Sequence, residues 1–267
     1  MSTVASVVRR HPIITFFVLS YALAWMLVPF GSFGAYGPLV AALVVVPITQ
    51  GVAGLKELGL RVIRWRVRWY WYAVALGVPL AVHLAVVGLN VASGAGVPSL
   101  TFSSLTTFLM VFAIRLVNPT DGPLGENPGW QGFALPGLQG SGYSPLVATA
   151  IVAPLVSLWH LPLFFWEPGG LQASVLVSGL VVTVAVTFFY NWLFNRTGGS
   201  VLLVILAHNL EGSIQYELGW IVMGVWLAVA IGVIVFDLKA WRNPVPSGAI
   251  NPPQATPSER TTPATPA

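Results

Sequence analysis

The segment LQASVLVSGLVVTVAVTFFYNWLF, residues 171–194, decides the fold class. It contains no Asp, Glu, Lys or Arg, and roughly 20 apolar residues are enough to cross the hydrocarbon core of a bilayer as a helix. Similar apolar runs recur along the 267-residue chain, of which 56% is hydrophobic and only 7% is charged. A soluble domain carries about 25% charged residues. The composition therefore predicts an all-α, polytopic integral membrane protein and excludes a soluble globular domain.

Apolar runs on both sides of that segment predict a bundle of about eight transmembrane helices. The expected spans are 12–29, 35–53, 70–92, 102–117, 145–166, 171–194, 199–217 and 218–240. Arg9 and Arg10 precede the first run as in a signal peptide, but no small-residue cleavage pattern ends it, so it is interpreted as a span. The chain then divides into three N-terminal helices (1–99), a central core (100–216), a last helix (217–242) and a Pro- and Thr-rich tail (243–267), which we expect to be disordered.

The positions of Lys and Arg predict the orientation of these helices. With a cytoplasmic N-terminus, eight spans place every Lys and Arg on the cytoplasmic side, including Arg115 and the basic segment 55–69. We therefore expect a multi-pass protein of a bacterial plasma membrane with both termini in the cytoplasm. Segment 55–69 is interpreted as a topology-setting loop, although its alternating basic and apolar residues also fit a segment that lies in the interface against anionic lipid.

The composition also limits the possible partners and cofactors. The net charge of +4 comes from bases between apolar runs rather than from one folded face. We therefore expect membrane lipids and a peptide or protein substrate in or at the membrane as partners, and no nucleic acid. The chain has no cysteine, which excludes disulfides, a thiol nucleophile and thiolate metal ligands.

Ionisable side chains inside the apolar runs are candidates for function, because a charge in the membrane interior is costly. They are His83, Arg115, Asp121, Glu126, His160, His208 and Glu211, with Asp237 near a helix end. His83 stands alone, and a packed, hydrogen-bonded histidine is the simpler interpretation. One carboxylate, Glu126, and two histidines, His160 and His208, come from separate stretches. Such a set activates water by general acid–base catalysis, or it holds a metal such as Zn²⁺.

The flanks of these residues form three recognisable strings, which are GENPGWQGFALPGLQ (125–139), SLWHLPLFF (157–165) and NRTGGSVLLVILAH (195–208). They resemble the motifs of the CAAX protease and bacteriocin-processing family of intramembrane peptidases, which includes the type II CAAX prenyl endopeptidases. The resemblance extends over about residues 100–212. It implies hydrolysis of a peptide bond in a substrate that is prenylated or otherwise delivered to the membrane.

The resemblance also implies roles for individual residues. By position, Glu126 is the expected general base on water, helped by His160, while His208 holds that water or stabilises the oxyanion. Asn127, Gln131 and Glu211 are expected to support them. The family is described both as metalloproteases and as glutamate-dependent, so a site without a cofactor and a Zn²⁺ site made of the same three catalytic residues are both open.

The chain departs from the family pattern at four positions. Asn127 replaces a second glutamate, Gln131 an arginine, Gly212 a common asparagine and Val156 an aromatic residue. Asn127 and Gln131 are four residues apart, so on a helix they face each other, and we expect their amides to hydrogen-bond in place of an ion pair. Asn127 followed by Pro128 is also typical of an N-cap and a first helical residue, which predicts a helix that starts just after Glu126.

Three functions therefore compete at this point. They are an intramembrane endopeptidase, a catalytically degenerate relative that acts as a membrane scaffold or peptide-binding protein, and a small-solute transporter. Retention of the carboxylate and both histidines favours the first, and the replaced motif residues favour the second. The helix count fits a transporter, but no inverted repeat is visible in the sequence.

Overall fold

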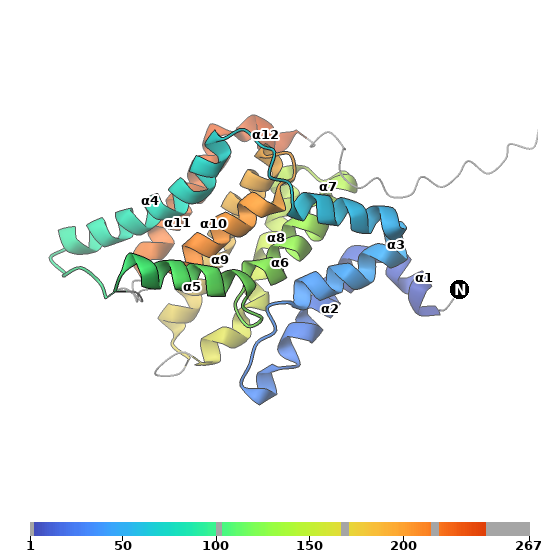
Figure 1. Ribbon diagram of the computed structural model, residues 1–267, viewed down its shortest axis with the longest axis horizontal. Helices are drawn as coiled ribbons and strands as arrows, with labels where there is room; N and C mark the ends of the chain where they lie inside the picture. Colours follow the sequence, from blue (N-terminus) through green and yellow to red (C-terminus); the bar gives the residue numbers. More distant parts are fainter. Residues whose placement is uncertain (1–2, 100–102, 167–170, 215–218, 244–267) are drawn as a thin grey trace, which may run out of the picture.

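The computed structural model describes residues 3–99, 103–166, 171–214 and 219–243, and every regular element in these ranges is a helix (Figure 1). In order they are α1 (Thr3–Arg10), α2 (Pro12–Trp25), the 3₁₀ helix η1 (Val28–Phe30), α3 (Gly37–Val62), α4 (Tyr70–Ala92), α5 (Leu105–Val117), α6 (Pro123–Gly129), the π-helix η2 (Trp130–Ala134), α7 (Leu135–Gly140), α8 (Pro145–Trp159), the 3₁₀ helix η3 (Leu161–Trp166), α9 (Ala173–Arg196), α10 (Val201–Ser213), α11 (Gly219–Phe236) and α12 (Leu238–Arg242). The predicted all-α class is confirmed.

Six helical stretches of the described chain are long and apolar enough to cross a membrane, so this is a multi-pass membrane protein. They are Pro12–Phe30, Gly37–Val62, Tyr70–Ala92, Pro145–Trp166, Ala173–Arg196 and Gly219–Phe236. The apolar helices α5 and α10 are shorter and coincide with the other two predicted spans. Each predicted span thus corresponds to an apolar helix, while the count of eight stays a prediction.

The short helices of the central core are surrounded by the long ones. Figure 1 shows α6, α8, α9 and α10 in the middle of the molecule, with α2 and α3 on one side and α4 and α11 on the other. Helix α6 packs on α3 and α10, α8 packs on α9, and α10 also packs on α4 and α5. The broken helices around residues 123–140 are therefore packed in protein, as irregular backbone at membrane depth requires.

Serine residues define where three of the core helices begin. Ser104, Ser144 and Ser200 are the N-caps of α5, α8 and α10, and each hydroxyl accepts a hydrogen bond from the backbone N–H three residues later. This contact satisfies one of the free N–H groups at a helix start. The caps fix the register of α8 and α10. One candidate histidine lies at the end of α8, and the other lies in the middle of α10.

Helix α6 begins earlier than predicted. Gly122 is extended and Pro123 is the first helical residue, so Glu126, Asn127 and Pro128 are all inside the helix. The predicted start after Glu126 is wrong, because Pro123 already provides the pre-organised first residue that a helix start favours. The chain then continues through the π-helical η2 into α7, and π-helical turns are frequent at functional sites.

Helix α3 runs to Val62, beyond the predicted end of its span at residue 53. Gly51 has φ 65° and ψ −159°, a conformation that residues with a side chain avoid. The helix is kinked at this glycine and continues beyond it. The first half of segment 55–69 is therefore helical, and the prediction of a loop there is wrong. Arg61 in this half is buried and donates from Nη1 to the carbonyl oxygen of Gly132 at 2.8 Å.

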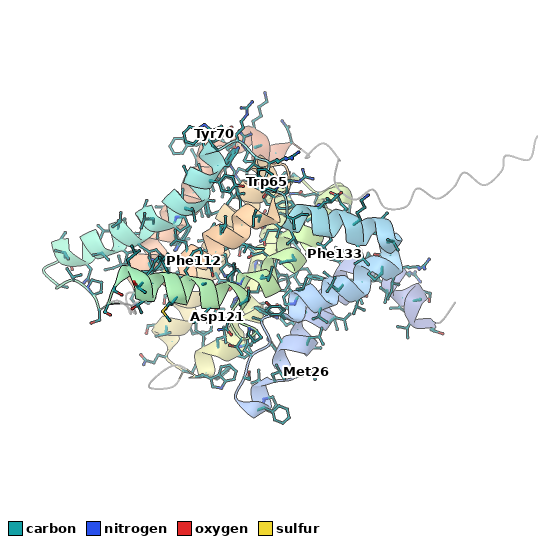
Figure 2. The ribbon with its side chains drawn as sticks, in the orientation of Figure 1. Met26, Trp65, Tyr70, Phe112, Asp121 and Phe133 are labelled. Carbon is teal, nitrogen blue, oxygen red and sulfur yellow. The ribbon has the colours of Figure 1, made fainter. Side chains whose placement is uncertain are left out.

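The second half of segment 55–69 lies at one end of the bundle. Trp65 lies in the upper part of the view in Figure 2, whereas Met26, at the other end of the α2–α3 pair, lies near its lower edge. Arg64 donates from Nη1 to the carbonyl oxygen of Gly198 at 2.7 Å, which ties this segment to the turn between α9 and α10. The loops after α3 and α9 thus share one end of the bundle, as the predicted orientation requires.

Two predictions fall outside the described residues. They are the junction of the last two spans at residues 217 and 218, and the tail beyond Asn243.

Candidate active site

A cavity of about 280 Å³ lies where α5, α6, α8, α9 and α10 meet. Its wall includes all six residues that the sequence predicts for the site, which are Glu126, Asn127, Gln131, His160, His208 and Glu211. Three stretches that are far apart in the sequence are therefore brought together, as expected. The wall also includes Arg115 and Asp121, from α5 and the loop that follows it.

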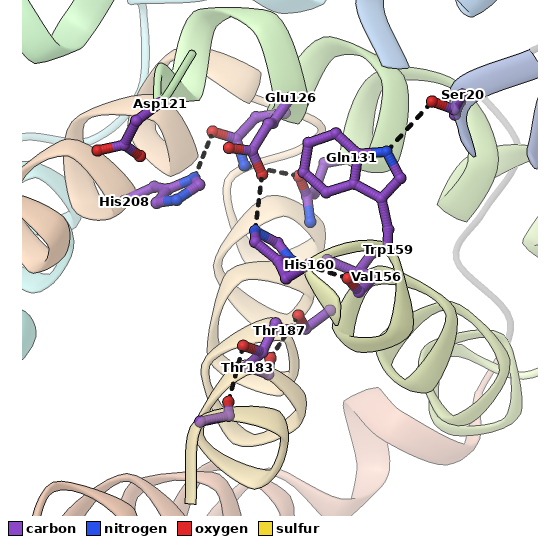
Figure 3. Close-up of polar contacts among 12 residues, drawn as sticks. Ser20, Asp121, Glu126, Gln131, Val156, Trp159, His160, Thr183, Thr187 and His208 are labelled. Atoms are coloured by element: carbon purple, nitrogen blue, oxygen red, sulfur yellow. Dashed lines mark hydrogen bonds and ion pairs between the residues drawn. The ribbon is translucent and has the colours of Figure 1, made fainter. Parts of the chain in front are cut away.

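Glu126 and His160 face each other in this cavity (Figure 3). Glu126 Oε2 lies 3.6 Å from His160 Nε2, and the glutamate is 3% exposed. His160 Nδ1 donates to the carbonyl oxygen of Val156 at 2.8 Å. Since a carbonyl oxygen only accepts, the proton of the neutral ring is on Nδ1 and Nε2 presents a lone pair. A carboxylate oxygen and an imidazole nitrogen are thus two neighbouring acceptors, an arrangement suited to a water that donates one hydrogen to each.

Contacts with α2 position the end of α8 that carries His160. The indole Nε1 of Trp159 donates to the carbonyl oxygen of Ser20 at 3.2 Å, and the carbonyl oxygen of Trp159 accepts from Trp25 Nε1 at 2.9 Å. The rings of Trp159 and His160 are perpendicular, with centroids 4.8 Å apart. Sequence reasoning missed this anchor because no local pattern relates residues that are more than a hundred positions apart.

A chain of amide side chains holds His208. Its Nδ1 donates to Asn127 Oδ1 at 3.1 Å, and Asn127 Nδ2 donates to Gln131 Oε1 at 3.0 Å. Gln131 Nε2 then donates to Asn191 Oδ1 at 2.9 Å, and Asn191 Nδ2 donates to Thr149 Oγ1 at 3.2 Å. The predicted hydrogen bond between the amides at 127 and 131 is confirmed. Because an amide oxygen only accepts, His208 carries its proton on Nδ1 and presents the Nε2 lone pair.

Asn191 and Thr149 are functional candidates that sequence reasoning missed. Both side chains are fully buried, in α9 and α8. The signal was present, because each is a polar residue within an apolar run. A neutral amide or hydroxyl costs less in the membrane than a charged group, so it stands out less against an apolar run.

Arg115, one of the predicted ionisable candidates inside the apolar runs, lines the cavity. Its side chain is 10% exposed. Nε and Nη2 donate to the two carboxylate oxygens of Asp121 at 3.1 and 3.0 Å, and Nη1 donates to the carbonyl oxygen of His208 at 3.0 Å. A two-point ion pair and a carbonyl compensate the guanidinium for the loss of water.

His83 has the structural role expected of it. The residue is buried in α4, and its Nε2 is 3.1 Å from the backbone carbonyl oxygen of Glu211. This hydrogen bond ties α4 to α10 beside the cavity. Glu211 thus contributes a carbonyl group to packing as well as a place in the cavity wall.

The donor atoms do not form a metal site in this arrangement. Among the residues that the structure describes, no group of three His, Cys, Asp or Glu side chains is arranged to hold a metal ion. Glu126 and His160 are neighbours, and His208 is held through Nδ1 by Asn127. A tetrahedral Zn²⁺ site made of these three side chains would require them to move toward one point.

Comparison with known families finds a match in the central part of the chain. Residues 104–214 match the model of the family described as type II CAAX prenyl endopeptidase Rce1-like. The match covers less than half of the chain, but it contains every residue that lines the cavity. Comparison with curated proteins finds no match. Residues 104–214 are thus similar to the Rce1-like type II CAAX prenyl endopeptidases, which confirms the family resemblance predicted from the three motifs.

Proposed function

We propose that the chain is an intramembrane endopeptidase that hydrolyses a peptide bond of a membrane-associated peptide or protein, which is prenylated or otherwise delivered to the membrane. The match to a protease family supports this class of reaction. The observation that carries the mechanism is the Glu126–His160 pair, whose Oε2 and Nε2 atoms lie 3.6 Å apart in a buried cavity.

In this mechanism a water molecule between Glu126 and His160 attacks the carbonyl carbon of the scissile bond. The water oxygen bonds to that carbon, Glu126 takes one proton, and the π electrons of the carbonyl move onto its oxygen. When the tetrahedral intermediate collapses, the C=O bond re-forms, the C–N bond breaks, and the amine nitrogen receives the proton from Glu126. One water is consumed, and the products are a carboxylic acid and an amine.

The two histidines have different tasks in the proposal. His160 accepts a hydrogen bond from the attacking water and aims its lone pair, because its Nδ1 is occupied by the Val156 carbonyl. His208 presents an acceptor to the cavity, since the amide chain keeps its proton on Nδ1. Because the two hydrogens of the water go to Glu126 and His160, this lone pair is suited to accept a hydrogen bond from an N–H group of the substrate.

The experiment that tests the function is a peptidase assay of the purified full-length protein in detergent or liposomes. The substrates are a panel of membrane-anchored peptides that includes farnesylated ones. We expect cleavage of at least one peptide, and Glu126→Gln should lower kcat about 100-fold or more because an amide cannot accept the proton. The matched control is Glu57→Gln, which changes a glutamate that pairs with Arg61 outside the cavity and should keep parental activity. Failure of the parent to cleave, or full activity of Glu126→Gln, would contradict the proposal.

The proposal includes the orientation in the membrane. Helices α5 and α10 have 13 residues each. At 1.5 Å per residue they are about 20 Å long, and we propose that they cross the bilayer as short spans packed among longer helices. Eight spans then place both termini in the cytoplasm of a bacterial cell. A reporter fused after Ala240 should report a cytoplasmic C-terminus, and an external signal would contradict the eight-span count.

A second candidate function is a catalytically degenerate relative that serves as a membrane scaffold or binds peptides. The replacement of motif residues by Asn127, Gln131 and Gly212 favours it. The double variant Asn127→Glu/Gln131→Arg distinguishes the two candidates. A double variant that gains activity from an inactive parent would identify the natural protein as a silenced relative.

A further inference from the structure

The cavity has one positive group whose placement the proposed mechanism does not use. Among its described lining residues, Arg115 is the one Lys or Arg, whereas three carboxylates, those of Asp121, Glu126 and Glu211, line the same space. An arginine has five N–H groups in a rigid fork. Three of them are committed to Asp121 and to the carbonyl oxygen of His208, which leaves two for a further partner.

Glycine at position 212 makes room for this cation. A Cβ atom built on Gly212 would overlap the Cζ, Nη2 and Nε atoms of Arg115. The guanidinium therefore fills the space that a side chain at position 212 would take. Gly212 lies one turn after His208 on α10, so the arginine of α5 enters the cavity at the level of that histidine.

The hydrogen bonds of the two histidines show why a donor is needed there. The attack of water puts a full negative charge on the carbonyl oxygen of the substrate, and donors at that point contribute strongly to catalysis. Neutral His160 and His208 both present lone pairs to the cavity, because each Nδ1–H is bound to another acceptor. Two acceptors and a carboxylate do not stabilise an oxyanion, whereas a guanidinium with two uncommitted N–H groups does.

We infer that Arg115 is the oxyanion-stabilising group of this site and that Gly212 is the residue that admits it. This inference rests on the proposed hydrolytic function and adds a catalytic residue to it. The charge that develops on the substrate oxygen is held by the guanidinium, and Asp121 fixes the plane of the fork through its two-point contact.

Binding of a charged analogue tests the inference without requiring turnover. The probes are a farnesylated CAAX peptide and its phosphinate, in which an anionic tetrahedral phosphorus group replaces the scissile amide. The parent should bind the phosphinate about 100-fold or more tightly than the peptide, as transition-state analogues do. Arg115→Gln should lower this preference about 100-fold, and kcat by a similar factor, because one donor group is lost. The affinity for the peptide itself should change little.

Variants at position 212 distinguish an effect of the position of the guanidinium from an effect of its charge. Gly212→Ala keeps the arginine but places a methyl group where its fork lies, so the preference for the phosphinate should fall as in Arg115→Gln. In the double variant Arg115→Ala/Gly212→Asn an amide occupies the vacated space, and we expect part of the preference to return. A purely structural role of Arg115 would show no such rescue.

Arg61→Gln is the matched control. Arg61 is also a buried arginine with a carboxylate and a carbonyl partner, but it lies outside the cavity. The Arg61→Gln variant should have a lower unfolding temperature in detergent and an unchanged preference for the phosphinate.

The outcomes distinguish this inference from the proposed function. A parent that binds the phosphinate through Arg115 but cleaves nothing would overturn the hydrolytic function and keep the anion site. A parent that cleaves, with a preference that survives in Arg115→Gln, would keep the function and overturn the inference. A parent without any preference, or an equal loss for peptide and phosphinate in Arg115→Gln, would overturn it as well. The last result would mean that Arg115 binds a part of the peptide that does not react.

Discussion

Two groups of polar residues meet at His208. They differ in how they compensate for the loss of hydration on burial. The amide group, Asn127, Gln131, Asn191 and Thr149, is neutral throughout, and each member is at most 2% exposed. The ion-pair group consists of Arg115 and Asp121, and the carboxylate side chain is 47% exposed. A buried ion pair must recover the cost of removing two charges from water. Of these two groups, the charged one has a partner that water reaches, and the one without access to water is neutral.

The largest expected effect comes from putting charge into the amide group. Asn127→Glu alone or Gln131→Arg alone buries an unpaired charge and should lower the free energy of unfolding by about 3–5 kcal/mol. The double variant restores an i,i+4 ion pair and should recover much of this loss. Unfolding in mixed micelles measures the three values. If the double variant is no more stable than the worse single one, the two positions are not partners and the comparison fails.

A smaller effect is expected from removing charge in the ion-pair group. Asp121→Asn deletes the negative partner of Arg115 but leaves an amide oxygen to accept one hydrogen bond. Since the carboxylate is half exposed, the free energy of unfolding should fall by about 1.5–3 kcal/mol, the value of a hydrogen bond to a charged group. The same unfolding experiment serves here. A loss as large as that of the single charge insertions would show that water does not reach this pair.

The end of the amide chain should be the most tolerant point. Thr149→Val keeps the shape of the side chain but removes the acceptor of Asn191 Nδ2, which should cost about 1 kcal/mol of unfolding free energy. Thr149→Ser keeps the hydroxyl and is the control, with a smaller loss that reflects packing alone. Equal losses in both variants would show that the chain ends at Asn191.

No effect is expected from removal of divalent metal. A Zn²⁺ ion bound by Glu126, His160 and His208 would require these three side chains to move toward one point. We therefore expect that treatment with a chelator, followed by its removal, leaves kcat and the melting temperature unchanged. Loss of activity on chelation and its recovery with added Zn²⁺ alone would establish the metal site instead.

The apolar helices and the residues that line the cavity were predictable from the sequence because both depend on local signals. An apolar run of about 20 residues identifies a membrane helix by itself, and a buried carboxylate or imidazole stands out against it. The pair Asn127–Gln131 was predictable for the same reason, since helical periodicity relates residues four apart. Residues from different helices could be assigned to one site because the three motifs resemble those of one family.

The missed features depend on contacts between distant parts of the chain. Arg115 was a candidate from the sequence, but its entry into the cavity requires both the packing of α5 on α10 and the missing side chain at Gly212. The hydrogen bond from Trp159 to Ser20 joins residues 139 positions apart. The helical start at Pro123 was a local signal, but Asn127–Pro128 is a competing signal for a later start. The kink at Gly51 was also a local signal, but the basic residues after Leu55 favoured a loop there.

The hydrogen-bond chain from His208 to Thr149 has a direction, and that direction has a consequence for the timing of events in the site. Each amide donates toward Thr149, so rotating one amide alone would set two oxygens or two N–H groups against each other. The amides can reverse only together, and the threonine hydroxyl at the end accommodates either sense. The tautomer of His208 is therefore a collective property of five residues on five helical elements. Rotation of one side chain alone does not change this tautomer. The tautomer changes only as fast as the whole hydrogen-bond chain reverses its direction.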